Sequence, residues 1–141
     1  MRILSIGYIN PETGSFIPLS NNLSEPLPHY PLMAVEFDIK NVGTKTALPG
    51  WQFTAQLPTN PSYTYTSGPE QALTPGSGII FTLRWSNPQS NNCYQPQIYP
   101  YQNYCQPQPY LYNQRAVTIA ADPNHIVPDE NWINNVASAA F

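Results

Sequence analysis

The sequence predicts an all-β protein, an antiparallel β-sandwich of about seven short strands. Apolar and polar residues alternate with a period of two in several segments, which places the apolar residues on one face of a strand. Turn-forming residues separate these segments at positions 41–43, 49–50, 58–61, 68–69 and 75–76. No window of about a dozen residues free of Pro and Gly shows the helical period of 3.6. Short strands with regular turns and no helices are typical of a sandwich.

Three segments show this alternation clearly. Their inward-facing residues are Met33, Val35, Phe37 and Ile39 in the first, Trp51, Phe53, Ala55 and Leu57 in the second, and Ile79, Phe81, Leu83 and Trp85 in the third. In the first segment the opposite face carries Glu36, Asp38 and Lys40. We therefore expect half-buried strands at all three places.

Four further strands have weaker signals. The segment "RAVTIAADP" turns Val117 and Ile119 inward and ends at Pro123. Residues 3–9, 63–67 and 136–141 complete the set. The register of residues 3–9 stays open, because two apolar sets compete for the inward face: Ile3 with Ile9, and Leu4 with Ile6 and Tyr8.

Composition places residues 1–141 in a single domain and narrows its partners. Only 9% of the 141 residues are charged and the net charge is -3, so no basic field exists to attract nucleic acid or an anionic membrane. No run of 18 apolar residues predicts a membrane span. A surface of Asn, Gln, Ser, Thr and Tyr with 17 prolines is common in secreted proteins. We therefore expect an extracellular or cell-surface location, with a signal peptide absent from this chain.

Three turn motifs, in this order, resemble the CARDB family of bacterial and archaeal adhesion-type domains. They are the Asn-Val-Gly-Thr turn at residues 41–44, the Pro-Gly turn at residues 75–76 and the segment from Asp-Pro to Asn-Asn at residues 122–135. The resemblance covers roughly residues 33–135. It implies an immunoglobulin-like, seven-stranded sandwich on exported and surface proteins, used as a repeated or appended module without catalytic activity.

The chain departs from the family pattern at two places. Trp132 stands where family members tend to have a second acidic residue, while Asp129 keeps the first. The family also joins the neighbouring strands by a short turn, whereas this chain has 29 residues at positions 86–114. Residues 86–114 are called the insertion below.

The insertion contains both cysteines of the chain and a cluster of aromatic side chains. Cys93 and Cys105 lie 12 residues apart, and in an oxidising compartment a disulfide between them stabilises by about 3 kcal/mol in the chain-entropy model. Six of the ten tyrosines lie in this segment: Tyr94, Tyr99, Tyr101, Tyr104, Tyr110 and Tyr112. Tyrosines among Asn and Gln have the chemistry of a paratope, and sugar binding uses the same residue types.

Other readings of the insertion compete with recognition. A low-complexity loop is one alternative, although such a loop has no use for so much aromatic area. A loop that folds back on its own sheet, with Ile98 and Leu111 as cover, is another. A metal site lacks two further ligands near the thiols, and a redox site favours a Cys-x-x-Cys spacing.

Catalytic chemistry has little support in the sequence. No Gly-x-Ser-x-Gly motif occurs. His125 lies near Asp122 and Asp129, so a base with an orienting acid is conceivable, but a histidine in a surface turn is the favoured explanation. Asp129 and Glu130 are adjacent, so on an extended segment they point apart. Weak calcium candidates are Asp122, Asn124, Asp129 and Glu130, with ordinary turn capping as the favoured explanation.

These observations predict a non-catalytic module without cofactors, displayed outside the cell. Its expected work is adhesion or interaction with a protein or glycan through the tyrosines of the insertion. One alternative is a stalk or filament subunit that assembles through copies of itself. A second alternative is an accessory domain of a secreted hydrolase.

Overall fold

The structure is a computed structural model of the chain, which describes residues 1–19, 31–59, 61–87, 115–128 and 132–141. Eight strands and one short 3-10 helix form in these ranges. They are β1 (Arg2–Ile9), β2 (Phe16–Pro18), β3 (Leu32–Lys40), β4 (Phe53–Leu57), β5 (Tyr63–Thr66), β6 (Gly78–Ser86), β7 (Ala116–Ala121), η1 (Trp132–Asn135) and β8 (Val136–Ala140). The prediction of an all-β fold is confirmed.

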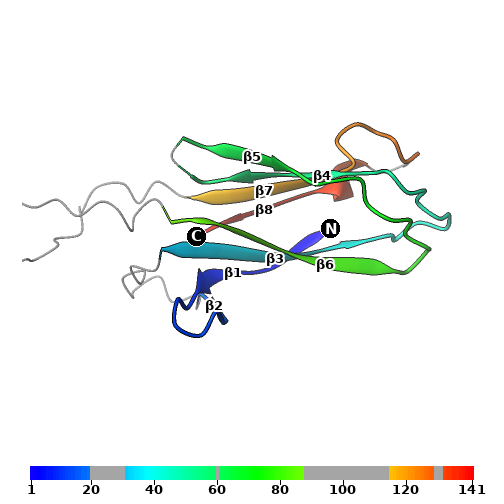
Figure 1. The fold of residues 1–141 in the computed structure, drawn as a ribbon. Coiled ribbons are helices and arrows are strands. Elements are labelled where there is room, and N and C mark those ends of the chain that lie inside the picture. The colour runs from blue at the N-terminus through cyan, green and yellow to red at the C-terminus, as the bar shows by residue number, and fades with distance from the viewer. Residues whose placement is uncertain (20–30, 60, 88–114, 129–131) are drawn as a thin grey trace, which may run out of the picture.

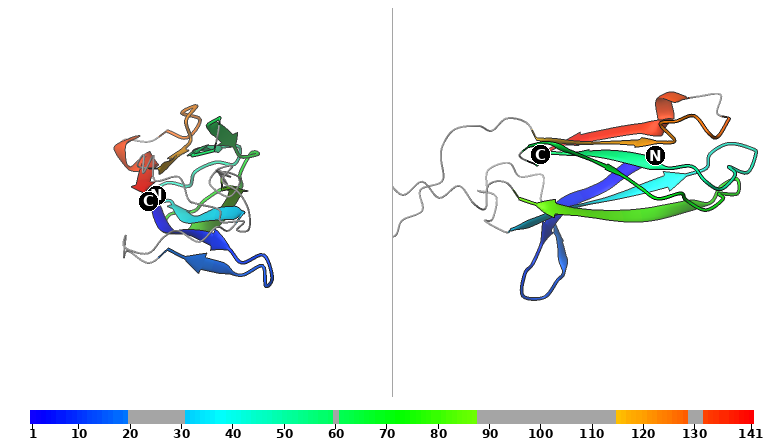
Figure 2. Two further views of the ribbon diagram at one scale, coloured as in Figure 1. Left: turned by 90° about the vertical axis from the view of Figure 1, so that its left-hand side faces the viewer. Right: turned by 45° about the horizontal axis from the view of Figure 1, so that its top comes forward.

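The strands form two four-stranded sheets. The first has the order β2-β1-β3-β6 and the second has the order β5-β4-β7-β8, with all neighbours antiparallel. Figure 1 and Figure 2 show the two sheets as layers that face each other. The chain crosses between the layers three times, from β3 to β4, from β5 to β6 and from β6 to β7. The predicted β-sandwich is therefore present, with eight strands in the described residues instead of about seven.

One apolar core fills the space between the sheets. Its most deeply buried large side chains are Phe37 and Val35 from the first sheet and Phe53, Val117 and Ile119 from the second. The Phe37 and Phe53 rings meet edge to face with centroids 5.2 Å apart, a favoured aromatic geometry. Every residue that the alternation placed inward belongs to this core or packs against it. Period-two alternation thus located the core correctly.

The open register of the first strand is explained by a β-bulge. Ile3 lies opposite Phe37, but the register shifts between Ile3 and Ser5, and Ile6 then lies opposite Val35. Ile3 and Ile6 both pack against the core, although they are an odd number of residues apart. The extra residue Leu4 allows this, because a bulge reverses the inward and outward positions that follow it. Each competing apolar set therefore contributes to the core.

The short strand β2 was not predicted. It follows a turn in which Asn10 Oδ1 accepts hydrogen bonds from the backbone N–H groups of Glu12 and Thr13. Gly7 of β1 pairs with Pro18 at the end of β2. A Cβ atom at Gly7 would overlap the backbone carbonyl of Ile17, so β2 approaches β1 where only glycine fits.

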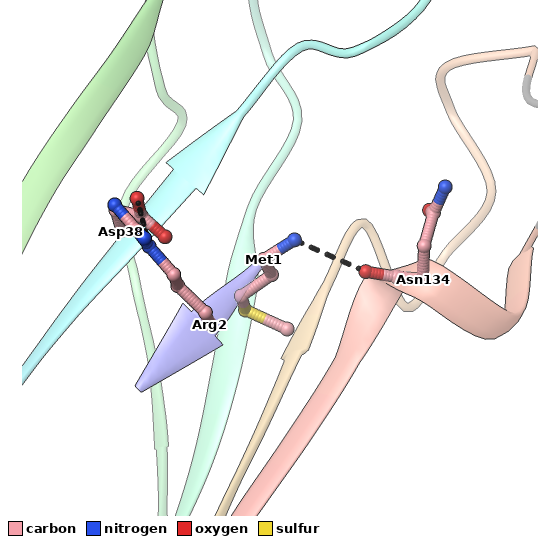
Figure 3. Close-up of polar contacts among 4 residues, drawn as sticks. All are labelled: Met1, Arg2, Asp38 and Asn134. Carbon is pink, nitrogen blue, oxygen red and sulfur yellow. Dashed lines mark hydrogen bonds and ion pairs between the residues drawn. The ribbon is translucent and has the colours of Figure 1, made fainter. Parts of the chain in front are cut away.

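The outer faces of the two sheets differ in charge. The outer face of the first sheet carries five charged residues: Arg2, Glu36, Asp38, Lys40 and Arg84. Arg2 Nε and Asp38 Oδ2 form an ion pair at 2.9 Å across β1 and β3, as Figure 3 shows. The outward positions of the second sheet carry no charge and are occupied by Thr, Gln, Ser, Ala and Val. No helix among the described residues is long and apolar enough to cross a membrane.

Candidate interaction site at the base of the insertion

The insertion joins the two sheets at one end of the sandwich. Ser86, which the prediction assigned to the insertion, is the last residue of β6 in the first sheet. The described chain continues to Asn87 and resumes at Arg115, directly before β7 of the second sheet. Face-to-face sheets are about 10 Å apart, so the insertion bridges two layers and is not the tip of a two-stranded hairpin. Asn87 and Arg115 are called the insertion base below.

A polar contact closes the insertion base. Arg115 Nη1 donates a hydrogen bond of 3.3 Å to Asn87 Oδ1. The backbone N–H of Asn87 donates to the carbonyl of Pro31 at 2.8 Å, and the backbone N–H of Phe141 donates to the carbonyl of Arg115 at 2.9 Å. Both ends of the insertion are thus tied to other parts of the sandwich: one to the start of β3 and the other to the C-terminal residue.

Burial makes these polar contacts significant. Asn87 is only 3% exposed, and a buried amide without partners costs about 1–3 kcal/mol. Arg115 is half-buried, and this desolvation lowers the pKa of its guanidinium below the ordinary value. The loss of hydration is offset in part by the Asn87 oxygen, because a hydrogen bond to a charged donor is stronger than a neutral one. Asn87 and Arg115 are therefore held in place where the insertion meets the sandwich.

Aromatic side chains pack beneath the insertion base. Trp85 of β6 is 5% exposed, and its ring centroid lies 6.3 Å from that of Phe141 with a tilt of 56°. Trp85 belongs to the first sheet, whereas Phe141 follows the last strand of the second. This contact joins the two layers at the end that carries the insertion. The residues that border the insertion are consequently held by packing as well as by hydrogen bonds.

The predicted binding residues of the insertion are not among the residues that the structure describes. Cys93, Cys105 and the six tyrosines of the insertion lie outside the described residues, and so do Asp129 and Glu130. The predicted disulfide and the predicted tyrosine surface remain predictions. The insertion base itself was not foreseen, because a polar pair 28 residues apart leaves no periodic signal in the sequence.

The calcium candidate Asp122 has a capping role in the structure. Its Oδ1 accepts a hydrogen bond from the backbone N–H of Ile126 at 3.0 Å, and its Oδ2 accepts one from Val127 at 2.7 Å. Asp122 is 6% exposed with a φ of 46°, at the turn that ends β7. Asn124 is exposed in the same turn. Within the described ranges no three His, Cys, Asp or Glu side chains gather closely enough to hold a metal ion.

The Asn-Val-Gly-Thr turn has a structural explanation of its own. Asn41 Nδ2 donates to the carbonyl oxygens of Lys45 and Leu73, both at 2.8 Å, and Asn41 Oδ1 accepts from the backbone N–H of Gly43 at 3.0 Å. The side chain shapes its own turn and also joins it to the segment before β6. Asn at this position therefore serves the fold and points to no ligand.

The Asn-Asn pair near the C-terminus contributes through its backbone. Asn134 and Asn135 belong to η1, and the amino group of Met1 donates to the carbonyl oxygen of Asn134 at 3.2 Å (Figure 3). This contact brings the start of β1 beside the start of β8. It links the first sheet, at the inner strand β1, to the second sheet, at the edge strand β8.

Comparisons with known proteins identify no relative. No family of known proteins, no curated protein and no solved structure matches the sequence. The resemblance to the CARDB family rests on the three turn motifs alone.

Proposed function

We propose that this protein is a non-catalytic, immunoglobulin-like module that works outside the cell and binds a protein or glycan through the insertion. The observation that carries the proposal is the insertion base, where both ends of an uncharged, tyrosine-rich segment are held by buried contacts. A recognition loop gains affinity when its ends are fixed, because less conformational entropy is lost on binding. A spacer loop has no need of a buried Asn87 and a desolvated Arg115 at its ends.

The strand order supports the immunoglobulin-like part of the proposal. One sheet contains β1, β3 and β6, and the other contains β4, β7 and β8. Immunoglobulin-like sandwiches divide their strands in this way, with strands A, B and E in one sheet and strands C, F and G in the other. In this correspondence the insertion joins strands E and F. The strands β2 and β5 extend the two sheets at their edges.

Composition supports the extracellular part. A surface with 9% charged residues and 17 prolines suits an exported protein, and a disulfide between Cys93 and Cys105 would close a loop within the insertion. Alkylation of the folded protein, recovered from an oxidising compartment, tests the disulfide. Neither thiol should react before reduction. Labelling of both thiols without a reductant would contradict this part of the proposal.

Binding by tyrosine variants tests the recognition surface. The six tyrosines of the insertion are replaced by serine together, and the matched control is Tyr63→Ser, because Tyr63 is 57% exposed on β5 outside the insertion. Both proteins and the parent are tested against a glycan array and a panel of intact cells. We expect the parent and the control to bind alike and the sixfold variant to lose binding. Equal binding by all three proteins, or no binding by the parent, would overturn the proposal.

A further inference from the structure

The outer edge of β6 differs from the other sheet edges. In the described residues the edge strands are β2, β5, β6 and β8, with 3, 4, 9 and 5 residues. β2 ends in Pro18, and β5 lies between Pro61 and Pro69. Short edges and flanking prolines are devices that prevent pairing with another chain. β6 is more than twice as long as β5, contains no proline, and pairs with β3 without a register shift.

The backbone groups on the outer edge of β6 follow from its register. Two hydrogen bonds at the ends of the ladder fix which residues of β6 bond to β3. Asn87 N–H donates to the Pro31 carbonyl, and Asn41 N–H donates to the Ser77 carbonyl. The odd-numbered residues of β6 therefore exchange hydrogen bonds with β3. The alternation of an antiparallel ladder then turns the N–H and C=O groups of the even-numbered residues away from β3. These residues are Gly78, Ile80, Thr82, Arg84 and Ser86.

The side chains of β6 are also incompletely covered. Ile80 is 68% exposed on the outer face. On the inner face Ile79, Phe81 and Leu83 pack against the core but are only partly buried. Phe81 is in contact with the centre of the core, because its ring centroid lies 4.6 Å from that of Phe53. A strand added beside β6 would cover apolar area on both faces of the sheet.

We propose that β6 pairs antiparallel with β6 of a second copy of this chain, about a two-fold axis at Thr82. This register is the one that pairs all five outward-pointing residues, Gly78 with Ser86, Ile80 with Arg84, and Thr82 with itself. On the inner face it sets Ile79 opposite Trp85 and Phe81 opposite Leu83, so apolar side chains meet apolar side chains throughout. The two first sheets become one continuous eight-stranded sheet.

Charge favours the second copy as the occupant. In this register Arg84 lies beside the Ile80 of the other copy, so its aliphatic stem covers that exposed side chain. One strand beyond Ile80 is Asp38, which is its partner on β3. Asp38 Oδ2 already pairs with Arg2 of its own chain, so Arg84 of the second copy would approach the other carboxylate oxygen, Oδ1. Two strand spacings are about 10 Å, which an arginine side chain spans once the flexibility of both side chains is included. The two Arg84 side chains avoid each other, because each lies opposite an isoleucine.

The pairing has a consequence for recognition, which rests on the proposed function. Antiparallel strands run in opposite directions, so the two insertion bases would lie at opposite ends of the shared sheet. Ten residues separate position 87 of one copy from position 87 of the other along this ladder, or about 30 Å at the rise of an extended strand. The dimer would therefore present two recognition loops in opposite directions and bridge two targets.

Sedimentation equilibrium of the 141-residue chain tests the pairing independently of any ligand. Thr82→Pro removes an outward N–H group but no bond to β3, so the strand stays folded and loses the centre of the new ladder. Ile80→Lys sets a lysine opposite Arg84 of the other copy, whereas Ile80→Glu sets a carboxylate there. Gln56→Lys is the matched control, because Gln56 is exposed on the central strand β4 of the other sheet. Circular dichroism confirms the fold of each variant.

We expect a dimer for the parent, Gln56→Lys and Ile80→Glu. Thr82→Pro and Ile80→Lys should raise the dissociation constant at least about tenfold, because the first removes hydrogen bonds at the centre of the pairing and the second sets like charges opposite each other. A parent that is monomeric at all concentrations overturns the proposal. A dimer that withstands both Thr82→Pro and Ile80→Lys also overturns it. Loss of the dimer with Ile80→Glu as well refutes this register. None of these outcomes bears on binding by the insertion.

Discussion

Replacement of Asn41 by Asp should destabilise the sandwich strongly, although the two side chains have nearly the same shape. The Asn41 amide donates to two carbonyl oxygens at 2.8 Å, those of Lys45 and Leu73. Asn41→Asp replaces this donor with a carboxylate oxygen, which faces both carbonyls and cannot donate when ionised. The acceptor role of Oδ1 toward Gly43 is retained. The substitution therefore tests the two donated hydrogen bonds.

The expected magnitude follows from those two bonds. Each neutral hydrogen bond contributes about 1 kcal/mol net, and the carboxylate set against two carbonyls adds about 1–2 kcal/mol. A loss of about 3–4 kcal/mol lowers the melting temperature of a chain of this size by about 10 °C. The repulsion disfavours the ionised form, so the pKa of the new carboxyl is raised in the folded state. The penalty is full at pH 7 and shrinks as the pH falls through that pKa, because a protonated carboxyl can donate again.

Calorimetry at pH 7 and at pH 3 measures both effects, and the chain supplies a matched control. Asn10 uses its side-chain oxygen to accept from Glu12 and Thr13, and Asn10→Asp keeps that acceptor. We expect Asn10→Asp to stay within about 0.5 kcal/mol of the parent. If Asn41→Asp melts at the same temperature as Asn10→Asp at pH 7, the reasoning about the Asn41 turn is wrong.

Three further substitutions test other contacts. Gly7→Ala should lower the unfolding free energy by about 1–3 kcal/mol because β2 must move away, while Gly68→Ala, with open space around it, should have little effect in the same denaturant titration. Ser67→Ala should lower the unfolding free energy by about 1–3 kcal/mol, because the buried hydroxyl accepts a hydrogen bond from Phe53 N–H at 3.0 Å. Hydrogen exchange at the Phe53 amide should become faster in this variant. Asn87→Ala should lower the unfolding free energy by about 1.5 kcal/mol in a guanidinium chloride titration, because the half-buried Arg115 loses its hydrogen-bond acceptor. An unchanged midpoint of the titration would show that this hydrogen bond does not stabilise the fold.

Alternation was informative wherever one face of a strand is buried and the other is not. It placed Phe37, Phe53 and Ile119 in the core, because burial of every second residue requires an apolar residue at every second position. β2 escaped the same reasoning, because three residues ending in a proline are too few to alternate. The bulge at Leu4 produced two conflicting apolar sets, which the sequence alone could not reconcile.

The alternation pattern could not predict contacts between segments that are far apart in the sequence. The hydrogen bond from Arg115 to Asn87 depends on how β6 and β7 are placed in different sheets, which no local motif encodes. The place of β6 at a sheet edge, among the described strands, likewise follows from strand order and not from the strand's own sequence. In contrast, the turn chemistry of Asn41 and the capping by Asp122 are local and agree with what those residue types favour in turns.

Replacement of the insertion from residue 88 onward is the most direct test of the account. Residues 88–114 are exchanged for Gly-Asn-Gly-Ser, which is long enough to cross the roughly 10 Å between the sheets and leaves Asn87 and Arg115 in place. Binding to the glycan array and the cell panel is then compared with that of the parent, after circular dichroism has shown equal folding. The account predicts that the shortened protein keeps its melting transition and loses binding. A shortened protein that folds and binds as the parent does would contradict it, and the insertion would then have no part in recognition.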